Sequence, residues 1–294
     1  MPAIITLLIA SLIWGTTGPV MKWALEAIPP FTLAFLRFTL ASIILTPLLW
    51  HFRKISLSHF PQIFSAAILG ITVHIPLFFF GLKLTFAINA ALIVAIVPVL
   101  TLAAAAVFLS EKLTLRLVFS AILASLGLVL IIGPPIFKLG PSHLAGTILL
   151  LAASLSWVGF EVVSKKLFKT YSAFTLMFYV PLIGAATLAP FAIFEFLANP
   201  QSFVTIGHQA VIGVLYGAIF SSSLAYTAWQ WGLSKLPTSQ AGFFLYLEPI
   251  SGILVSIVLL GEKITSLFIV GAALVILAIF LAEHKRKVHP LYQK

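Results

Sequence analysis

Residues 11–14 read SLIW, and residues 154–157, which lie 143 positions further along the chain, read SLSW. A second offset, of 151 positions, aligns EKLT at 111–114 with EKIT at 262–265. The difference of eight between the two offsets indicates one insertion in the second half, which we place before the eighth apolar run. The chain is therefore predicted to contain two copies of one structural unit.

The composition indicates a membrane protein. Of the 294 residues, 61% are hydrophobic and only 8% are charged, whereas a soluble domain has roughly a quarter charged residues. A membrane-spanning helix needs roughly 20 apolar residues, so this length allows about ten spans. Ten apolar runs of suitable length are present: Ala3–Leu25, Phe31–Trp50, Pro61–Leu82, Phe86–Leu109, Leu115–Ile132, Leu144–Phe168, Ser172–Leu197, Gln209–Trp231, Thr238–Leu260 and Thr265–Leu281.

The runs divide evenly between the two copies, with residues 1–135 holding the first five and residues 143–284 holding the other five. An odd number of spans makes the two copies enter the membrane in opposite directions. Secondary transporters are often built from such inverted repeats, although duplication alone also leaves repeats and some channels have them. The prediction is an all-α integral membrane protein of ten transmembrane helices, followed by a basic cytoplasmic tail at 285–294.

The positive charges predict the orientation, since Lys and Arg accumulate in short cytoplasmic loops. With the N-terminus inside, twelve of the 17 Lys and Arg residues fall on the cytoplasmic side, four fall outside, and Arg37 lies within the second run. Both termini are therefore expected in the cytoplasm, and the protein in the inner, cytoplasmic membrane. Arg37 is expected to extend outward to the membrane surface and to be structural.

Several function classes are disfavoured by the same composition. The net charge of +10 lies between apolar runs rather than on one solvated face, which does not indicate a nucleic-acid partner. The chain has no Asp and no Cys, and it lacks His-Glu-x-x-His and phosphate-binding loop motifs. We therefore expect no enzyme activity, no catalytic residue, no metal and no cofactor.

An ordered set of residues in both halves resembles the EamA family of the drug/metabolite transporter superfamily. The set comprises Trp14-Gly15, Arg37 within FLRF, the spacing from Pro98 to Glu111, and the echo of that spacing from LEP at 247–249 to GEK at 261–263. The resemblance implies two inverted EamA repeats around a cavity lined mainly by spans 1, 3, 4, 6, 8 and 9, with spans 5 and 10 peripheral. It also implies export of small metabolites such as amino acids.

Two ionisable residues near the middle of their spans are candidates for the cavity, because such groups are costly in lipid unless they face a cavity or a partner. Glu248, beside Pro249 in the ninth run, is expected to bind and release a proton and so to couple transport to the proton gradient. The alternative is a carboxyl group permanently bonded to a neighbouring helix. His74, in the third run, either meets substrate or proton or is a hydrogen-bonded packing residue.

Trp14 and Trp157 are equivalent in the two copies and lie at the centres of their spans, away from the surface where anchoring tryptophans collect. They are predicted to form aromatic walls of the cavity or to fill the core. A zwitterionic or amphipathic metabolite is expected between them, with its cationic group toward Glu248. The remaining predicted cavity residues are Thr17, Ser222, Tyr226 and Phe244.

Five further residues are predicted to act at the two mouths of the pathway. Lys22 and Lys165 are equivalent by the repeat and are expected at opposite ends. Glu161 precedes Lys165 by four residues, a spacing that allows a pair on one helix face. Asn89 and Gln240 are equivalent amides near the starts of the fourth and ninth runs, and are expected to cap alternating gates.

Together these features predict a secondary active transporter that exports an amino acid or similar amphipathic metabolite by alternating access. The expected partners are the small-molecule substrate, protons as the coupling ion, and the lipid bilayer. A lipid flippase or a multidrug exporter of the same fold, or a facilitative channel, are the alternatives. The oligomeric state is left open, with a homodimer through the peripheral spans as one arrangement.

Overall fold

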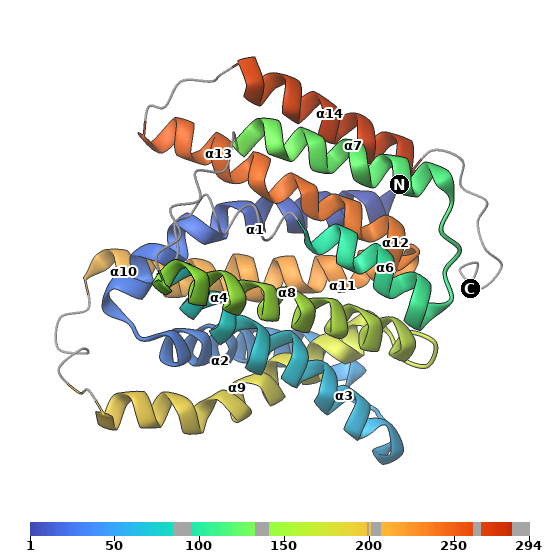
Figure 1. Cartoon of the computed structure of the whole chain (residues 1–294). Coiled ribbons are helices and arrows are strands. Elements are labelled where there is room, and N and C mark those ends of the chain that lie inside the picture. The colour runs from blue at the N-terminus through green and yellow to red at the C-terminus, as the bar shows by residue number, and fades with distance from the viewer. Residues whose placement is uncertain (85–95, 133–140, 199, 201–206, 261–265, 284–294) are drawn as a thin grey trace.

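The computed structural model describes residues 1–84, 96–132, 141–198, 200, 207–260 and 266–283. These residues form helices joined by short connections, without a strand among them, and the helices run lengthwise beside one another (Figure 1). In lipid every backbone polar group must be bonded within the protein, which favours helices for apolar runs of this length. The α-helices are α1 Pro2–Ala27, α2 Pro30–Leu49, α3 Phe60–Ala67, α4 His74–Leu84, α6 Val97–Leu109, α7 Leu115–Ile132, α8 Pro141–Leu167, α9 Ala173–Ala198, α10 His208–Tyr216, α11 Tyr226–Lys235, α12 Thr238–Ala241, α13 Leu247–Leu260 and α14 Ser266–Glu283.

Seven helical segments of the described chain are long and apolar enough to cross a membrane. They correspond to the first three, the sixth to eighth and the tenth predicted runs. The described parts of the fourth and fifth runs are the shorter apolar helices Val97–Leu109 and Leu115–Ile131. The ninth run is broken into α12, the 3-10 helix η6 Gly242–Tyr246, and α13.

The third and eighth runs each contain a π-helical segment, η3 Ile68–Val73 and η5 Gly217–Ala225. The offset of 151 places residues 68–73 on residues 219–224, within η5. Because π-helical turns are rare and often occur at functional sites, their recurrence at one register indicates that the duplicated unit carries this irregularity. Each segment continues directly into a helix, η3 into α4 and η5 into α11.

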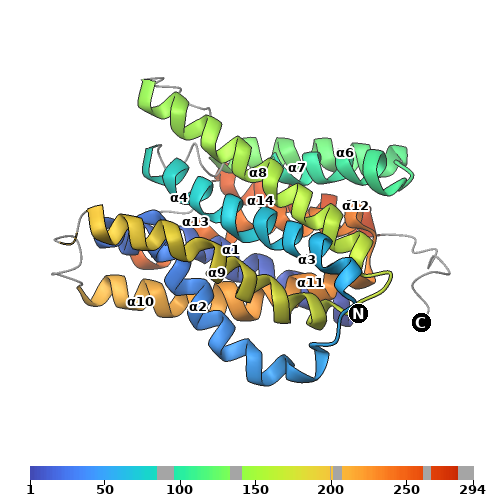
Figure 2. The same ribbon diagram turned by 90° about the horizontal axis from the view of Figure 1, so that it is seen from below.

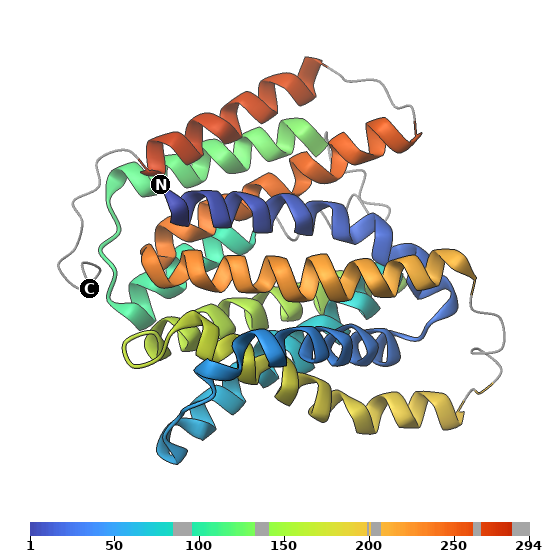
Figure 3. The same ribbon diagram turned by 180° about the vertical axis from the view of Figure 1, so that it is seen from behind.

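The fifth and tenth runs, α7 and α14, lie together along one edge of the bundle (Figures 1 and 3). They approach closely at Gly127 and Gly271, where a Cβ added to Gly271 would lie 2.4 Å from the Gly127 carbonyl oxygen. Small residues at such contacts let membrane helices pack backbone to backbone. The pair therefore has the peripheral position that the family resemblance implied.

On another side of the bundle α2 lies along α9, while α8 packs beside α4 and α3 (Figure 2). The start of α2 is held by Glu195 of α9. Its carboxylate accepts hydrogen bonds from Phe31 N at 3.2 Å, Thr32 N at 2.8 Å and Thr32 Oγ1 at 2.9 Å. These amides lack partners within the helix, so Glu195 supplies a cap from another element.

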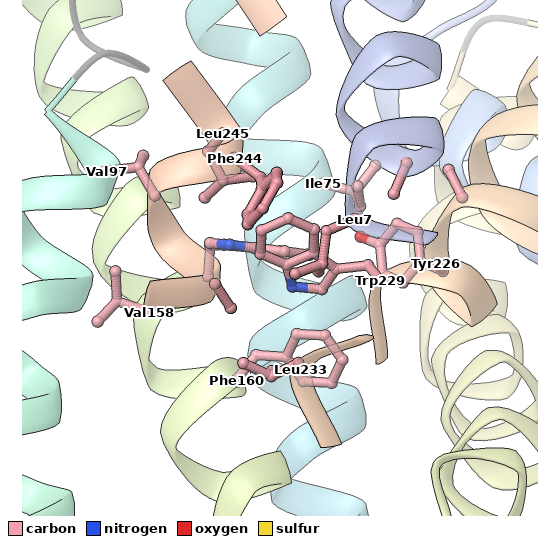
Figure 4. Packing of buried hydrophobic residues seen from close by; sticks show 14 of the residues in the cluster. Leu7, Ile75, Val97, Val158, Phe160, Tyr226, Trp229, Leu233, Phe244 and Leu245 are labelled. Atoms are coloured by element: carbon pink, nitrogen blue, oxygen red, sulfur yellow. The ribbon is translucent and has the colours of Figure 1, made fainter. Parts of the chain in front are cut away.

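The first helix packs against α13, η5 and α11 in the centre of the molecule. Gly15 of α1 lies against the backbone of Glu248, and a Cβ at Gly15 would lie 2.3 Å from the Glu248 carbonyl oxygen. Beside this contact Trp229, Leu7 and Phe160 form a buried apolar cluster (Figure 4). The cluster lies next to the cavity described below.

Candidate functional site

A cavity of about 100 Å³ lies within the bundle. Its wall combines residues of spans 1, 2, 3, 4, 6, 8 and 9, which is the set that the resemblance implied with span 2 added. Six of the eight predicted cavity residues line it: Trp14, Thr17, His74, Trp157, Tyr226 and Glu248.

The other two predicted cavity residues are replaced in the wall by their neighbours. Ser221 lines the cavity instead of Ser222, and Leu245 lines it instead of Phe244. Phe244 is buried in the apolar core (Figure 4). Both positions lie in segments that are not α-helical, η5 and η6. Because these turns are not α-helical, the residues that face the cavity do not follow α-helical spacing there.

Three aromatic side chains form one wall of the cavity. Trp14 lies edge-on to Trp157, with ring centroids 5.2 Å apart and an interplanar angle of 87°. Tyr226 lies 5.4 Å from Trp14 and 5.6 Å from Trp157, again edge-on. Such edge-to-face packing is favourable for aromatic rings, and it gives the cavity a rigid apolar surface supplied by both repeats.

His74 and Glu248 add polar groups to this wall. The His74 Nδ1 group lies 2.9 Å from the Ala153 carbonyl oxygen, so Nδ1 carries a proton and donates it. Among the described residues the Glu248 carboxyl group has no hydrogen-bond partner, although its own backbone carbonyl accepts from Ser251 Oγ. The alternative of a carboxyl group satisfied by a neighbouring helix therefore has no support in this part of the chain.

Arg37 also lines the cavity, and the expectation that it extends to the membrane surface is wrong. The side chain is 2% exposed. Its Nη2 group donates hydrogen bonds to Ser221 Oγ at 3.0 Å and Ser222 Oγ at 3.1 Å. These neutral hydroxyl groups of η5 hold the guanidinium inside the bundle. The offset of 143 aligns Arg37 with Val180, an asymmetry that could have marked it as functional.

Glu161 and Lys165 do not form the predicted pair, because each contacts a different element. Glu161 Oε2 accepts a hydrogen bond of 2.7 Å from Thr101 Oγ1 of α6. Lys165 Nζ donates to the carbonyl oxygens of Leu233, at 2.7 Å, and Leu236 at the end of α11. Each side chain therefore connects α8 to a neighbouring helix, and the two side chains do not bond to each other.

Glu111 forms a clamp that sequence reasoning missed. Helix α6 ends in a left-handed residue, Ser110, with φ 56°. The following carboxylate accepts hydrogen bonds from Thr238 N at 2.7 Å, Ser239 N at 2.9 Å and Ser239 Oγ at 2.5 Å. The recurrence of EKLT at 111–114 as EKIT at 262–265 is the sequence signal that could have identified Glu111. We call these three bonds the Glu111 clamp.

The clamp and the Lys165 contacts lie at the end of the bundle where the N-terminus lies (Figure 1). They join α6, α8, α11 and α12 at this end. Gln240 is half-buried in α12, beside the clamp, while Lys22 is exposed on α1. The predicted gating residue Asn89 lies outside the described residues.

The described structure is thus a helical bundle with a cavity between its two repeats, an arrangement found in many secondary transporters. The chain matches the EamA-like transporter family over residues 1–133 and 144–283. It belongs to this family and is a multi-pass membrane transporter.

Its relatives carry transporter names. An "uncharacterized transporter" of Archaeoglobus fulgidus is 26% identical over 275 residues, which are 93% of this chain and 95% of the relative. A "probable amino-acid metabolite efflux pump" of Salmonella typhimurium is 27% identical, over 93% of this chain and 92% of the relative. A "probable terminal-alkyne amino-acid exporter" of Streptantibioticus cattleyicolor is 25% identical, over 96% and 94%. A crystal structure of a protein 22% identical to this chain superimposes with a TM-score of 0.79 and covers 96% of both chains, which shows the fold.

Proposed function

We propose that the protein is a secondary active transporter that moves an amino acid or similar small amphipathic metabolite by alternating access, and that it acts as an exporter. The observation that supports this is the central cavity, whose aromatic wall adjoins Arg37, His74 and Glu248. Alternating access needs a barrier on one side of such a cavity at a time, and the Glu111 clamp supplies one. The names of the Salmonella and Streptantibioticus relatives support amino-acid cargo.

The size of the cavity favours a small metabolite over a lipid. A volume of about 100 Å³ is small beside the roughly 300–1,000 Å³ of pockets that hold drug-sized ligands. A small polar compound needs only a modest expansion of this space. A lipid flippase or a multidrug exporter would need a much larger one.

We further propose that the chain crosses the inner membrane ten times and that both termini lie in the cytoplasm. In that orientation the Glu111 clamp lies at the cytoplasmic end, so the proposed barrier is on the cytoplasmic side. Protons are the proposed coupling ion, with Glu248 and His74 as the groups that carry them. Glu248 suits this role because its carboxyl group faces the cavity without a described partner.

The experiment is solute exchange in proteoliposomes loaded with a pool of amino acids and related metabolites, read by mass spectrometry with and without a pH gradient. The expected result is selective, saturable loss of a few compounds, counterflow, and acceleration by the gradient. Glu248→Gln should abolish that acceleration, whereas Glu26→Gln, at an exposed glutamate of α1, should preserve it. Non-saturating flux without counterflow, or no selective loss, would refute the proposal.

A further inference from the structure

The guanidinium of Arg37 is a buried positive charge in the wall of the cavity. Its hydrogen bonds to Ser221 and Ser222 run to neutral hydroxyl groups. The rings of Phe38 and Phe79 also lie near it, with centroids 5.6 and 5.5 Å from Cζ. Within the described part of the chain, no carboxylate lies within ion-pair distance of this guanidinium.

A charge in this environment is expensive to maintain unless an opposite charge or a polar cavity accompanies it. Hydroxyl groups and aromatic faces offset only part of that cost. Nη2 makes both described side-chain hydrogen bonds, and Nε is buried without a partner. Arg37 lines the cavity and no hydrogen bond is described for its Nη1 group, so the guanidinium retains donor capacity, and an anion that enters the cavity would complete its coordination.

We propose that Arg37 binds the carboxylate of the substrate. Guanidinium groups suit this role because their planar fork matches carboxylate geometry. Glu248 lines the same cavity from α13, and its carboxyl group complements the ammonium group of an α-amino acid as Arg37 complements the carboxylate. The inference rests on the proposed function, since it requires that the transported compound occupies this cavity.

The position of the guanidinium depends on Gly217 at the start of η5. A Cβ added there would lie 2.8 Å from both Cδ and Nε of Arg37, which is too close for an unmoved side chain. Gly217→Ala therefore displaces the guanidinium while its charge is retained. Gly271→Ala is the matched control, because its clash is with Gly127 in the peripheral α7–α14 contact.

The test uses the purified full chain in proteoliposomes and three matched pairs of competitors: L-threonine, L-leucine and L-phenylalanine, each against its amide. Each amide keeps the ammonium group and the side chain but lacks the carboxylate. Inhibition of exchange is measured for the wild type, Arg37→Gln, Arg37→Lys, Gly217→Ala and Gly271→Ala. The exchanged substrate in this assay is the compound that the proteoliposome experiment with the metabolite pool identifies.

In the wild type at least one acid should inhibit about tenfold to a hundredfold more strongly than its amide, as expected for hydrogen bonds between charged groups. The ratio should fall to about one in Arg37→Gln, be partly retained in Arg37→Lys, decrease in Gly217→Ala and stay unchanged in Gly271→Ala. A purely structural role would lower transport without changing this ratio. If Arg37→Gln does not fold, the ratios measured for Arg37→Lys and Gly217→Ala test the proposal instead.

Three results would overturn the inference: equal inhibition by acids and amides in the wild type, an unchanged ratio in every folded variant at Arg37 and Gly217, or no inhibition by any of the six compounds. The last result together with saturable exchange of another cargo would leave the proposed function intact. Absence of saturable exchange for every compound would overturn the proposed function as well.

Discussion

Replacement of Glu111 by Gln should open the end of the bundle that the Glu111 clamp holds together. The carboxylate accepts three hydrogen bonds from Thr238 and Ser239, and a glutamine amide has only one oxygen to replace its two. At least one bond is lost, and an amide N–H is placed against another donor. A hydrogen bond to a charged group contributes about 1.5–3 kcal/mol, so a loss of about 2 kcal/mol favours opening by about 30-fold.

The natural chain has no cysteine, which makes thiol accessibility a direct assay. Ala241 is fully buried in α12 next to the Glu111 clamp, and Ala241→Cys should react slowly with a membrane-impermeant maleimide. Adding Glu111→Gln should raise the labelling rate by about 30-fold. Glu26→Gln, in the same Ala241→Cys background, should leave the rate unchanged.

The reasoning is refuted if the double variant labels at the rate of Ala241→Cys alone while it remains folded. It is also refuted if Glu26→Gln accelerates labelling to the same extent, because the effect would then not depend on the clamp. Unfolding is distinguished by the thermal melting curve, which should keep a single cooperative transition.

Three further predictions concern stability and the aromatic wall. Glu195→Ala removes the cap of α2 and should lower the free energy of unfolding by about 1–2 kcal/mol, measured by denaturant titration in detergent. Gly15→Ala should destabilise the protein by about 1–3 kcal/mol, because the new Cβ would lie 1.8 Å from Ser251 Oγ and 2.3 Å from the Glu248 carbonyl oxygen. A second change of Ser251→Ala should not restore stability, because the contact with the carbonyl oxygen would remain. Trp157→Leu removes the edge-to-face contacts of the cavity wall, and should raise the KM for exchange with little change in kcat. A lowered kcat at unchanged KM would contradict that role.

The membrane fold could be predicted from the sequence because its determinants are local or repeated. Apolar runs predict helices in lipid, and the recurrence of SLIW and EKLT predicts two copies of one unit. The peripheral place of α7 and α14 was implied by the family resemblance, and the close approach of Gly127 and Gly271 explains why the two helices pack against each other.

The site was predicted less completely, because three features depend on tertiary structure. The π-helical and 3-10 segments displaced the lining from Ser222 to Ser221 and from Phe244 to Leu245. Glu161 was assigned to a partner on its own helix, whereas its carboxyl group bonds to Thr101 on another. A spacing of four residues identifies a neighbour, but the packing of other helices decides the contact.

The orientation of the Arg37 side chain is a further case in which contacts with another helix override a prediction from sequence position, and here the outcome bears on function. An arginine two turns from the membrane surface can reach water, but the hydroxyl groups of η5 hold it inward. The two π-helical segments recur at one register in both halves, whereas Arg37 aligns with Val180 and Glu248 aligns with Val97. The duplicated backbone therefore accounts for the shape of the cavity. The charges that lack a counterpart in the other repeat account for its polarity, and they are the residues in which cargo selectivity should differ between relatives of the same fold.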